Sequence, residues 1–335
     1  MKILVTGSTG FIGRLLVERL VCQGEHLNLL CRPQSDLSGL NSANSKIVYG
    51  DISDPDSLER AVSDCDRIFH IAAYAKNWAR NPATFYDINV RGLINVLNAA
   101  EKMHLKRVVF TSSSVSFGPS NGTPVTETTV RKTPFLTEYE QSKYLAEQNI
   151  QEYLNRGLEV VIVNPTRVFG PGLMTEGNSV TRMIGMYLNG RFRTLPGNGS
   201  RIGNYAFVDD VVSGHIFAME KGKTGSRYIL GGENLSYNGF FGLVSEIADT
   251  KRWMVHIPPP VALAYSHIEN YRACRSSHYP LITPGWVRTF LADWAFSSVR
   301  AHDELGYTIT PIRTALSLTI QWLKDRDHME KGVSR

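Results

Sequence analysis

Three glycines spaced three residues apart lie close to the start of the chain, in the stretch TGSTGFIG. The apolar run Lys2–Thr6 before them predicts a strand, and the segment Phe11–Gln23 after them has helical period. A tight turn, a backbone that faces an anion, and a close contact between helix and strand each require a residue without a Cβ atom. In this context the motif predicts a dinucleotide site with the phosphates at the helix N-terminus. The residues expected there are Gly7, Thr9, Gly10, Phe11, Ile12 and Gly13.

Strand and helix patterns alternate through the first half of the chain, which predicts an α/β fold. The predicted strands are Lys2–Thr6, His26–Arg32, Lys46–Tyr49, Arg67–Ile71, Arg107–Thr111 and Glu159–Asn164. The predicted helices are Phe11–Gln23, Asp56–Asp64, Pro82–Met103 and Glu138–Arg156. Several of the strands are apolar almost throughout, as in a sheet covered on both faces, so we expect a doubly wound parallel sheet of the Rossmann type.

The alternation ends at Pro165, after which loops rich in glycine and proline separate short elements. This change predicts a dinucleotide-binding domain over residues 1–164. Residues 165–335 are expected to form mostly a smaller C-terminal substrate lobe, with some segments returning to the first domain.

Composition excludes several classes of function. The 36 basic and 31 acidic residues contain no Lys/Arg block, so nucleic acid is not an expected partner. The four cysteines form no CxxC and the nine histidines no HExxH, so no metal site is expected. An apolar run long enough to span a membrane and a secretory leader are both absent from the sequence, which predicts a cytoplasmic protein.

The end of the second predicted strand bears on the choice of dinucleotide, because a carboxylate there would bind the adenosine ribose of NAD. This chain has Leu30, Cys31 and Arg32 instead. A guanidinium without an adjacent acid suits the 2′-phosphate, so NADP(H) is expected and NAD(H) is the alternative. Arg32 could otherwise be a solvated loop residue. Asp51, followed by Ile52, is expected at the adenine amino group or, alternatively, as the cap of its own turn.

Tyr139 and Lys143 are four residues apart in the predicted helix Glu138–Arg156, so they share one helix face. A phenol beside an ammonium can serve acid–base chemistry, but the bare spacing also occurs by chance on solvated helices. Further motifs therefore have to decide between the two interpretations.

Nine motifs occur in order along residues 1 to about 324: TGSTGFIG, GDISD, HIAA, DINVRGLINVL, VVFTSSSVSFG, YEQSK, NPTRVFGPG, YAFVDDVV and DWAFSSVRAHDELGY. Together they resemble the extended short-chain dehydrogenase/reductase family, also called the NAD-dependent epimerase/dehydratase family. Within it the chain resembles the branch that contains dihydroflavonol-4-reductase-like, 3β-hydroxysteroid-dehydrogenase-like and hopanoid-associated sugar epimerase proteins.

This resemblance implies that Tyr139 is the general acid and that Lys143 binds the nicotinamide ribose. We expect the Lys143 ammonium to favour the phenolate and to lower the pKa of Tyr139 from its usual ~10. The resemblance also implies that Ser113 polarises the substrate carbonyl, although a register error of one residue would select Ser112 or Ser114.

The same resemblance implies roles for several other residues. Asn89 helps to fix the site or is buried for packing. Ala72 and Ala73 let the cofactor lie close to the sheet, and Pro165 and Val168 flank the nicotinamide. His70, just before the two alanines, is expected to be a satisfied core histidine.

Two substitutions bear on the class of reaction. Ser114 and Val115 stand where nucleotide-sugar dehydratases carry an Asp-Glu pair, so elimination of water is not expected. Gly203 and Asn204 replace an Arg-Asp pair whose arginine binds the diphosphate of sugar nucleotides. The cations that could substitute for that arginine are Arg191, Arg193 and Arg201.

The sequence therefore favours an NADP(H)-dependent reductase of a small, largely apolar carbonyl compound. A sugar or nucleotide-sugar epimerase with tightly bound NAD(P) and a non-catalytic NADP(H)-binding protein are the alternatives. A homodimer formed through the two long helices is expected only by analogy with relatives.

Overall fold

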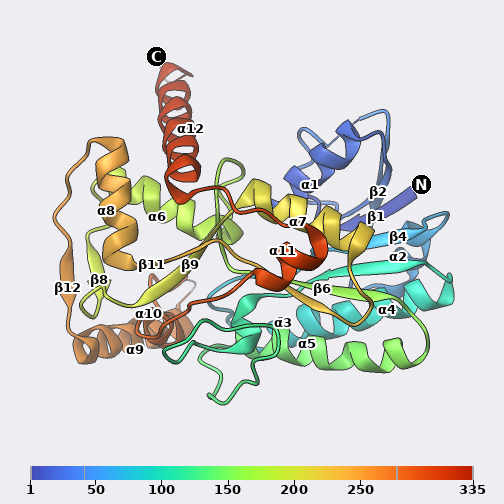
Figure 1. Cartoon of the computed structure of the whole chain (residues 1–335), viewed down its shortest axis with the longest axis horizontal. Helices are drawn as coiled ribbons and strands as arrows, with labels where there is room; N and C mark the ends of the chain where they lie inside the picture. The colour runs from blue at the N-terminus through green and yellow to red at the C-terminus, as the bar shows by residue number, and fades with distance from the viewer. Residues whose placement is uncertain (1, 41, 277, 334–335) are drawn as a thin grey trace.

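A seven-stranded parallel sheet organises the protein (Figure 1). The computed structural model describes residues 2–40, 42–276 and 278–333. The strand order is β10-β6-β5-β4-β1-β2-β3. From β1 the chain adds β2 and β3 on one side and then β4, β5, β6 and β10 on the other, so the order of strands switches between β1 and β4. The strands are β1 (Lys2–Thr6), β2 (His26–Cys31), β3 (Ser45–Tyr49), β4 (Arg67–His70), β5 (Arg107–Thr111), β6 (Val160–Pro165) and β10 (Arg227–Leu230). The predicted fold class and all six predicted strands are confirmed to within one residue at each end.

Helices cover both faces of this sheet, as Figure 1 shows. Helices α1 (Phe11–Cys22) and α7 (Val208–Lys221) pack together on one face, with α11 (Val299–Leu305) against α7. Helices α2 (Pro55–Val62), α4 (Gly92–Lys102) and α5 (Glu138–Asn155) lie on the other face. Two mainly aliphatic cores lie between the sheet and its two layers of helices. A strand that is covered on both sides places apolar side chains on both faces of the sheet.

The prediction of one continuous helix over Pro82–Met103 is wrong. The structure divides it into α3 (Ala83–Tyr86), a π-helical turn η1 (Asp87–Arg91) and α4. A π turn inserts extra backbone into a helix and is frequent at functional sites. Here the turn carries Asn89, which is buried against the start of α5.

A second lobe follows β6. Its three-stranded sheet has the order β11-β9-β7, and a separate pair joins β8 to β12. The strands are β7 (Arg167–Phe169), β8 (Thr194–Pro196), β9 (Ile202–Phe207), β11 (Glu233–Ser236) and β12 (Val255–Ile257). The helices are α6 (Ser179–Leu188), α8 (Tyr237–Ala248), α9 (Pro259–Arg275), α10 (Pro284–Phe290) and α12 (Ile312–Val333). An aromatic core rich in Phe and Tyr joins these elements except β12 and α9, and α9 packs on α10.

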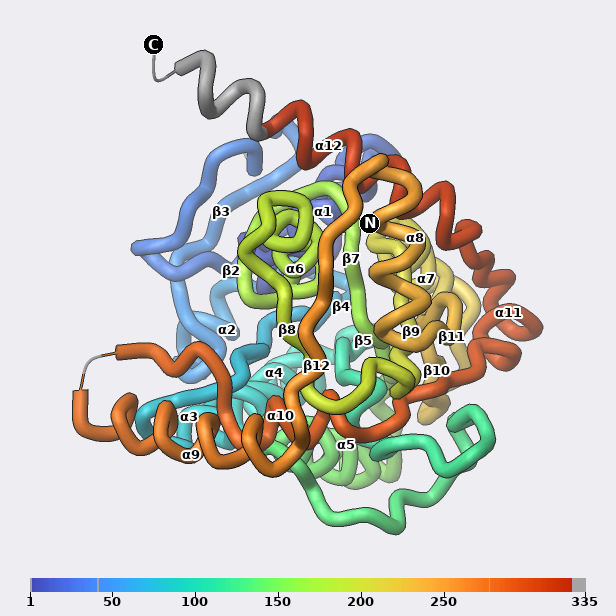
Figure 2. The backbone as a smooth tube through the Cα atoms, turned by 90° about the vertical axis from the view of Figure 1, so that its left-hand side faces the viewer, coloured from blue at the N-terminus to red at the C-terminus, as the bar shows by residue number. Residues whose placement is uncertain are grey.

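Elements from the second half of the chain also build the parallel sheet and the helices that cover it. Strand β10 pairs with β6, and α7 packs on β5 and β6. Figure 2 shows α9 and α10 at one end of the molecule, beside α3 and α5 of the first domain. None of the helices in the described ranges combines the length and apolarity that a membrane span needs.

Candidate active site

The glycine turn between β1 and α1 forms a cradle without side chains. Gly7 has φ +76°, and a Cβ atom there would lie 2.5 Å from the amide nitrogen of Ala72. A Cβ atom on Gly13 would lie 2.1 Å from the carbonyl oxygen of Gly7. Gly10 precedes α1 and supplies no side-chain cap, so the amides of the first helical turn remain available to an anion. The cradle therefore fits the pyrophosphate of a dinucleotide.

Arg32 lies at the end of β2, with its side chain exposed. Arg14 of α1 is engaged with the loop after it, donating from Nη2 to the carbonyl oxygen of Asp36 at 3.0 Å. Asp51 accepts hydrogen bonds from the amide of Ser53 at 2.9 Å and from its hydroxyl at 2.7 Å. The carboxylate of Asp51 thus caps its own turn, and its neighbour Ile52 is buried.

Arg32→Ala is expected to weaken NADPH binding by ~1.5 to 3 kcal/mol, the scale of a hydrogen bond to a charged group. NADH binding should change little, because NADH lacks the 2′-phosphate. Titration of both cofactors by fluorescence measures the difference, with Arg60→Ala, an exposed arginine on α2, as the control. Equal losses for the two cofactors would remove Arg32 from the 2′-phosphate site.

Tyr139 lies in the first turn of α5. The N-cap residue Thr137 starts this helix, its hydroxyl accepting the amide of Glu140 at 3.1 Å. Burial raises the pKa of Tyr139 to about 12, and a hydrogen bond with Ser113 only partly opposes this rise. The expected lowering of this pKa by Lys143 is therefore wrong, because desolvation of the phenolate dominates. A phenol with such a pKa keeps its proton at neutral pH.

Lys143 lies one turn further along α5 and is 1% exposed. Its Nζ donates to the carbonyl oxygen of Thr111 at 2.8 Å and lies 5.0 Å from the ring centroid of Phe110. Burial lowers the pKa of Lys143 to about 7, against the opposing effect of Glu147. The ammonium is thus held at the carboxyl end of β5, on the same helix face as Tyr139.

The three serines that follow β5 separate in the structure. The hydroxyl of Ser112 donates to the carboxylate of Glu147. Ser113 caps the short 3-10 helix η2 (Ser114–Phe117), and its hydrogen bond with Tyr139 acts on the pKa of the phenol. Among the serines considered from the sequence, the structure thus places Ser113 at the proposed acid.

Asn89 connects the loop after β4 to the start of α5. Its Oδ1 accepts the amide of Tyr74 at 2.7 Å, and its Nδ2 donates to the hydroxyl of Ser142 at 2.9 Å. Ser142 in turn donates to the carbonyl oxygen of Tyr139 at 2.9 Å. Asn89 therefore positions the backbone of Tyr139 through Ser142, a route that the sequence does not reveal.

The strand end at β4 is closely packed. His70 is 1% exposed, its Nδ1 lies 2.7 Å from the hydroxyl of Thr6, and burial lowers its pKa to about 3. A neutral, satisfied histidine of this kind is a core residue. Ala72 follows it against the glycine turn, and Ala73 continues the chain past the same edge.

A buried network behind the serines was not anticipated from the sequence. The Glu147 carboxylate accepts from Ser116 at 2.9 Å and from Asn164 at 2.8 Å, and it forms an ion pair with Arg227 at 2.9 Å. Glu147 is four residues after Lys143, so the spacing that places Lys143 beneath Tyr139 also points to this carboxylate.

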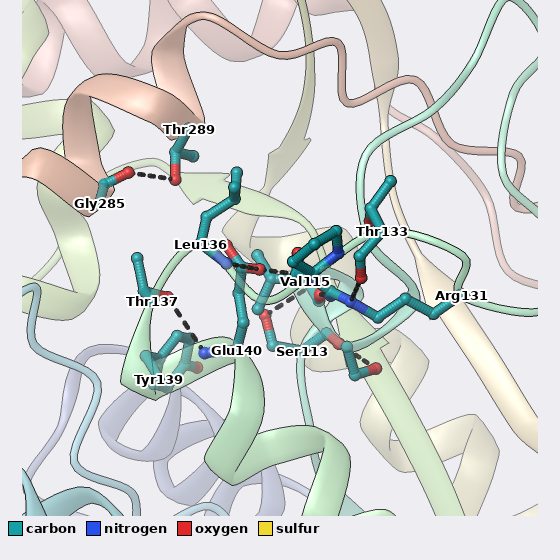
Figure 3. A network of polar contacts seen from close by, with 12 residues as sticks. Ser113, Val115, Arg131, Thr133, Leu136, Thr137, Tyr139, Glu140, Gly285 and Thr289 are labelled. Carbon is teal, nitrogen blue, oxygen red and sulfur yellow. Dashed lines mark hydrogen bonds and ion pairs between the residues drawn. The ribbon is translucent and has the colours of Figure 1, made fainter.

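A second buried ion pair adjoins Tyr139 (Figure 3). The guanidinium of Arg131 lies 2.7 Å from the carboxylate of Glu140, and the two side chains are 5% and 2% exposed. Arg131 also donates to the carbonyl oxygens of Val115 at 2.7 Å and Thr133 at 3.0 Å. It therefore ties the segment after Ser113 to the start of α5.

Pro165 ends β6 and Val168 lies in β7, and both are buried. Arg167 between them was missed in the sequence. It hydrogen-bonds the hydroxyl of Tyr237, and its guanidinium carbon lies 5.0 Å from that ring and 5.6 Å from the ring of Phe290 in α10. Its signal was a cation in the NPTRVFGPG motif directly before a residue expected at the nicotinamide.

Two of the three cations considered as substitutes for a diphosphate-binding arginine, Arg193 and Arg201, have other partners. Arg201 pairs with Asp293 at 2.9 Å, and Arg193 donates to the carbonyl oxygen of Gly190 at 2.9 Å. Asn204 is also committed, accepting from Thr166 at 2.7 Å and from the amide of Gly232 at 2.8 Å. These engaged groups give no support to a diphosphate site at this position.

Residues 3–231 match the model of the NAD dependent epimerase/dehydratase family. The chain belongs to this family. A Synechocystis sp. protein provisionally named a dihydroflavonol 4-reductase is 30% identical over 97% of this chain and 95% of its own length. Cinnamoyl-CoA reductase 1 of Oryza sativa subsp. japonica is 27% identical over 98% and 91%. The resemblance to the dihydroflavonol-reductase-like branch is therefore confirmed, and this family member is an NAD(P)-dependent oxidoreductase.

Among solved structures, the UDP-glucose 4-epimerase of Thermotoga maritima superposes with a TM-score of 0.81. The two chains are 24% identical, and the match covers 97% of this chain and 99% of the other. At this identity the likeness concerns the fold, which is shared by reductases and epimerases alike.

Proposed function

We propose that this family member is an NADP(H)-dependent reductase of a ketone or aldehyde on a small, largely apolar carbon skeleton. The proposal rests on the buried Lys143 one turn after Tyr139 on α5, together with the hydrogen bond between Ser113 and Tyr139 that acts on the pKa of the phenol. Neutral residues, Ser114 and Val115, follow this contact, where a dehydratase would carry acids. Relatives named as reductases over nearly the whole chain support the same reaction class.

The proposed chemistry assigns a task to each side chain. The bound cofactor would supply hydride at the carbonyl carbon. Ser113 would donate a hydrogen bond to the carbonyl oxygen, and Tyr139 would transfer its phenolic proton to that oxygen as negative charge develops. Lys143, buried on the same helix face, would bind the ribose hydroxyls of the nicotinamide. The substrate carbonyl becomes an alcohol, and the phenol regains its proton from solvent.

A panel assay tests the proposal. Purified protein is offered NADPH with ketones, aldehydes, flavanonols, 3-oxoacyl compounds and nucleotide sugars, and NADPH absorbance is followed. The expected result is consumption of NADPH in the presence of an uncharged ketone or aldehyde. Cofactor binding without turnover on any carbonyl would instead support the non-catalytic alternative.

The epimerase alternative is separated from reduction by cofactor exchange. A reductase must exchange its oxidised cofactor in every cycle, so the purified protein should release its nucleotide and consume one NADPH per carbonyl. An epimerase returns the hydride to its substrate and can retain the dinucleotide. Stoichiometric, non-exchanging nucleotide, together with interconversion of a sugar epimer pair without NADPH loss, would contradict the reductase proposal.

A further inference from the structure

Helix α9 has an inverted pattern of burial. The residues that it turns toward the protein are small or polar: Ala262 at 5%, Ser266 at 0%, Glu269 at 4% and Ala273 at 0% exposure. Its outer face carries the large apolar side chains of Val261, Tyr265, Ile268 and Tyr271, which are 46–57% exposed. A surface helix of a globular protein ordinarily buries such side chains and exposes polar ones. The outer face of α9, defined by these four residues, therefore has the character of a contact surface.

The charges around this outer face have one sign. Helix α9 carries Arg272 and Arg275 in its last turn and a single acid, Glu269. That acid is turned inward, where it lies 3.4 Å from Arg272 and 3.6 Å from His278. Arg275 lies over the ring of Tyr271, its guanidinium carbon 4.5 Å from the centroid. Solvent therefore meets apolar and aromatic groups flanked by cations.

We propose that the outer face of α9 docks onto an anionic lipid surface. Helices that lie in a membrane interface combine an apolar or aromatic face with Lys and Arg, whose stems remain among the acyl chains while the charges reach the headgroups. Each basic residue near an anionic leaflet contributes to attraction. A second copy of this protein is a poorer occupant, because a twofold contact would bring the same cations together.

The position of α9 connects this surface to the candidate active site. It lies at the edge of the molecule and packs on α10 (Figure 2). Just after α9, the carbonyl oxygen of Ser276 accepts Arg80 at 2.9 Å and the ring of Tyr279 packs edge-on against Trp78. Both partners lie in the loop that follows β4. Docking at this face would allow direct uptake of a lipid-dissolved carbonyl compound. This consequence rests on the proposed function, whereas the docking itself does not.

Vesicle flotation of the full chain tests the docking. Vesicles of phosphatidylcholine alone are compared with vesicles that also contain phosphatidylglycerol. We expect binding to the anionic vesicles, weakening as salt is added, and little binding to the neutral ones. Val261→Ser/Ile268→Ser should weaken binding about tenfold or more, since it removes two apolar side chains from the outer face. The matched control is Val299→Ser/Leu318→Ser, which replaces side chains 63% and 50% exposed on α11 and α12.

The outcomes separate the alternatives. Absence of binding to both vesicle types, or equal losses in the two double variants, would overturn the proposal. Sedimentation showing a dimer that only Val261→Ser/Ile268→Ser dissociates would also overturn it, assigning the face to a second copy. Thermal melting checks that both variants fold. Turnover of a water-soluble carbonyl should be equal in both, and docking without any turnover would reject the proposed function alone.

Discussion

Tyr139→Phe is expected to lower kcat by ~10²- to 10⁴-fold, the usual contribution of general acid–base catalysis. Burial raises the pKa of Tyr139 to about 12, so the wild-type phenol enters the reaction protonated. Phenylalanine preserves the ring and its packing but has no proton to donate. NADPH affinity should remain close to wild type, because the substitution removes only the hydroxyl.

The matched control is Tyr144→Phe, on the same helix. The ring of Tyr144 lies 5.3 Å from that of Phe135, so this tyrosine packs against a different neighbour. Steady-state kinetics with NADPH, together with cofactor titration, measure both variants. If Tyr139→Phe keeps more than about a tenth of the wild-type rate, another group supplies the proton.

Arg131→Met should destabilise the protein by about 3–5 kcal/mol, the cost of leaving one partner of a buried ion pair alone. Glu140 would then keep a carboxylate that is 1% exposed, and burial already raises its pKa even with Arg131 present. The loss is large compared with a typical unfolding free energy of about 5–15 kcal/mol. Urea denaturation measures the change.

An exposed pair provides the control for this prediction. Arg313 and Glu246 lie 2.9 Å apart, with side chains 58% and 61% exposed, so Arg313→Met should cost about 1 kcal/mol or less. The double variant Arg131→Met/Glu140→Gln should recover part of the lost stability, since it removes the stranded charge. Equal effects of Arg131→Met and Arg313→Met would show that the buried pair contributes no more than a surface pair.

Much of the first domain could be predicted because its signals are local. Apolar runs specify the strands, and the glycine spacing specifies a turn between β1 and α1 whatever the rest of the chain does. The shared face of Tyr139 and Lys143 follows from helical periodicity alone. The same locality allowed the boundaries of α5 to be placed within one residue.

Long-range contacts decided the features that were missed or wrong. Ser113 and Ser112 are distinguished only by their partners: the Ser113 hydroxyl bonds Tyr139, and the Ser112 hydroxyl bonds Glu147. The pKa of Tyr139 depends on how deeply the fold buries it, which outweighs the charge expected from Lys143. The role of Asn89 required a π turn whose partners come from two other segments.

The sequence by itself determined the alternating α/β order, the anion-binding turn and the helix face that carries the candidate acid, because each depends on neighbours within a few residues. Only the tertiary structure showed which polar groups become buried partners and which apolar groups remain outside. The buried pair of Arg131 and Glu140 and the outward side chains of α9 are examples. Burial and desolvation arise from segments that are distant in the chain, so no local pattern specifies them.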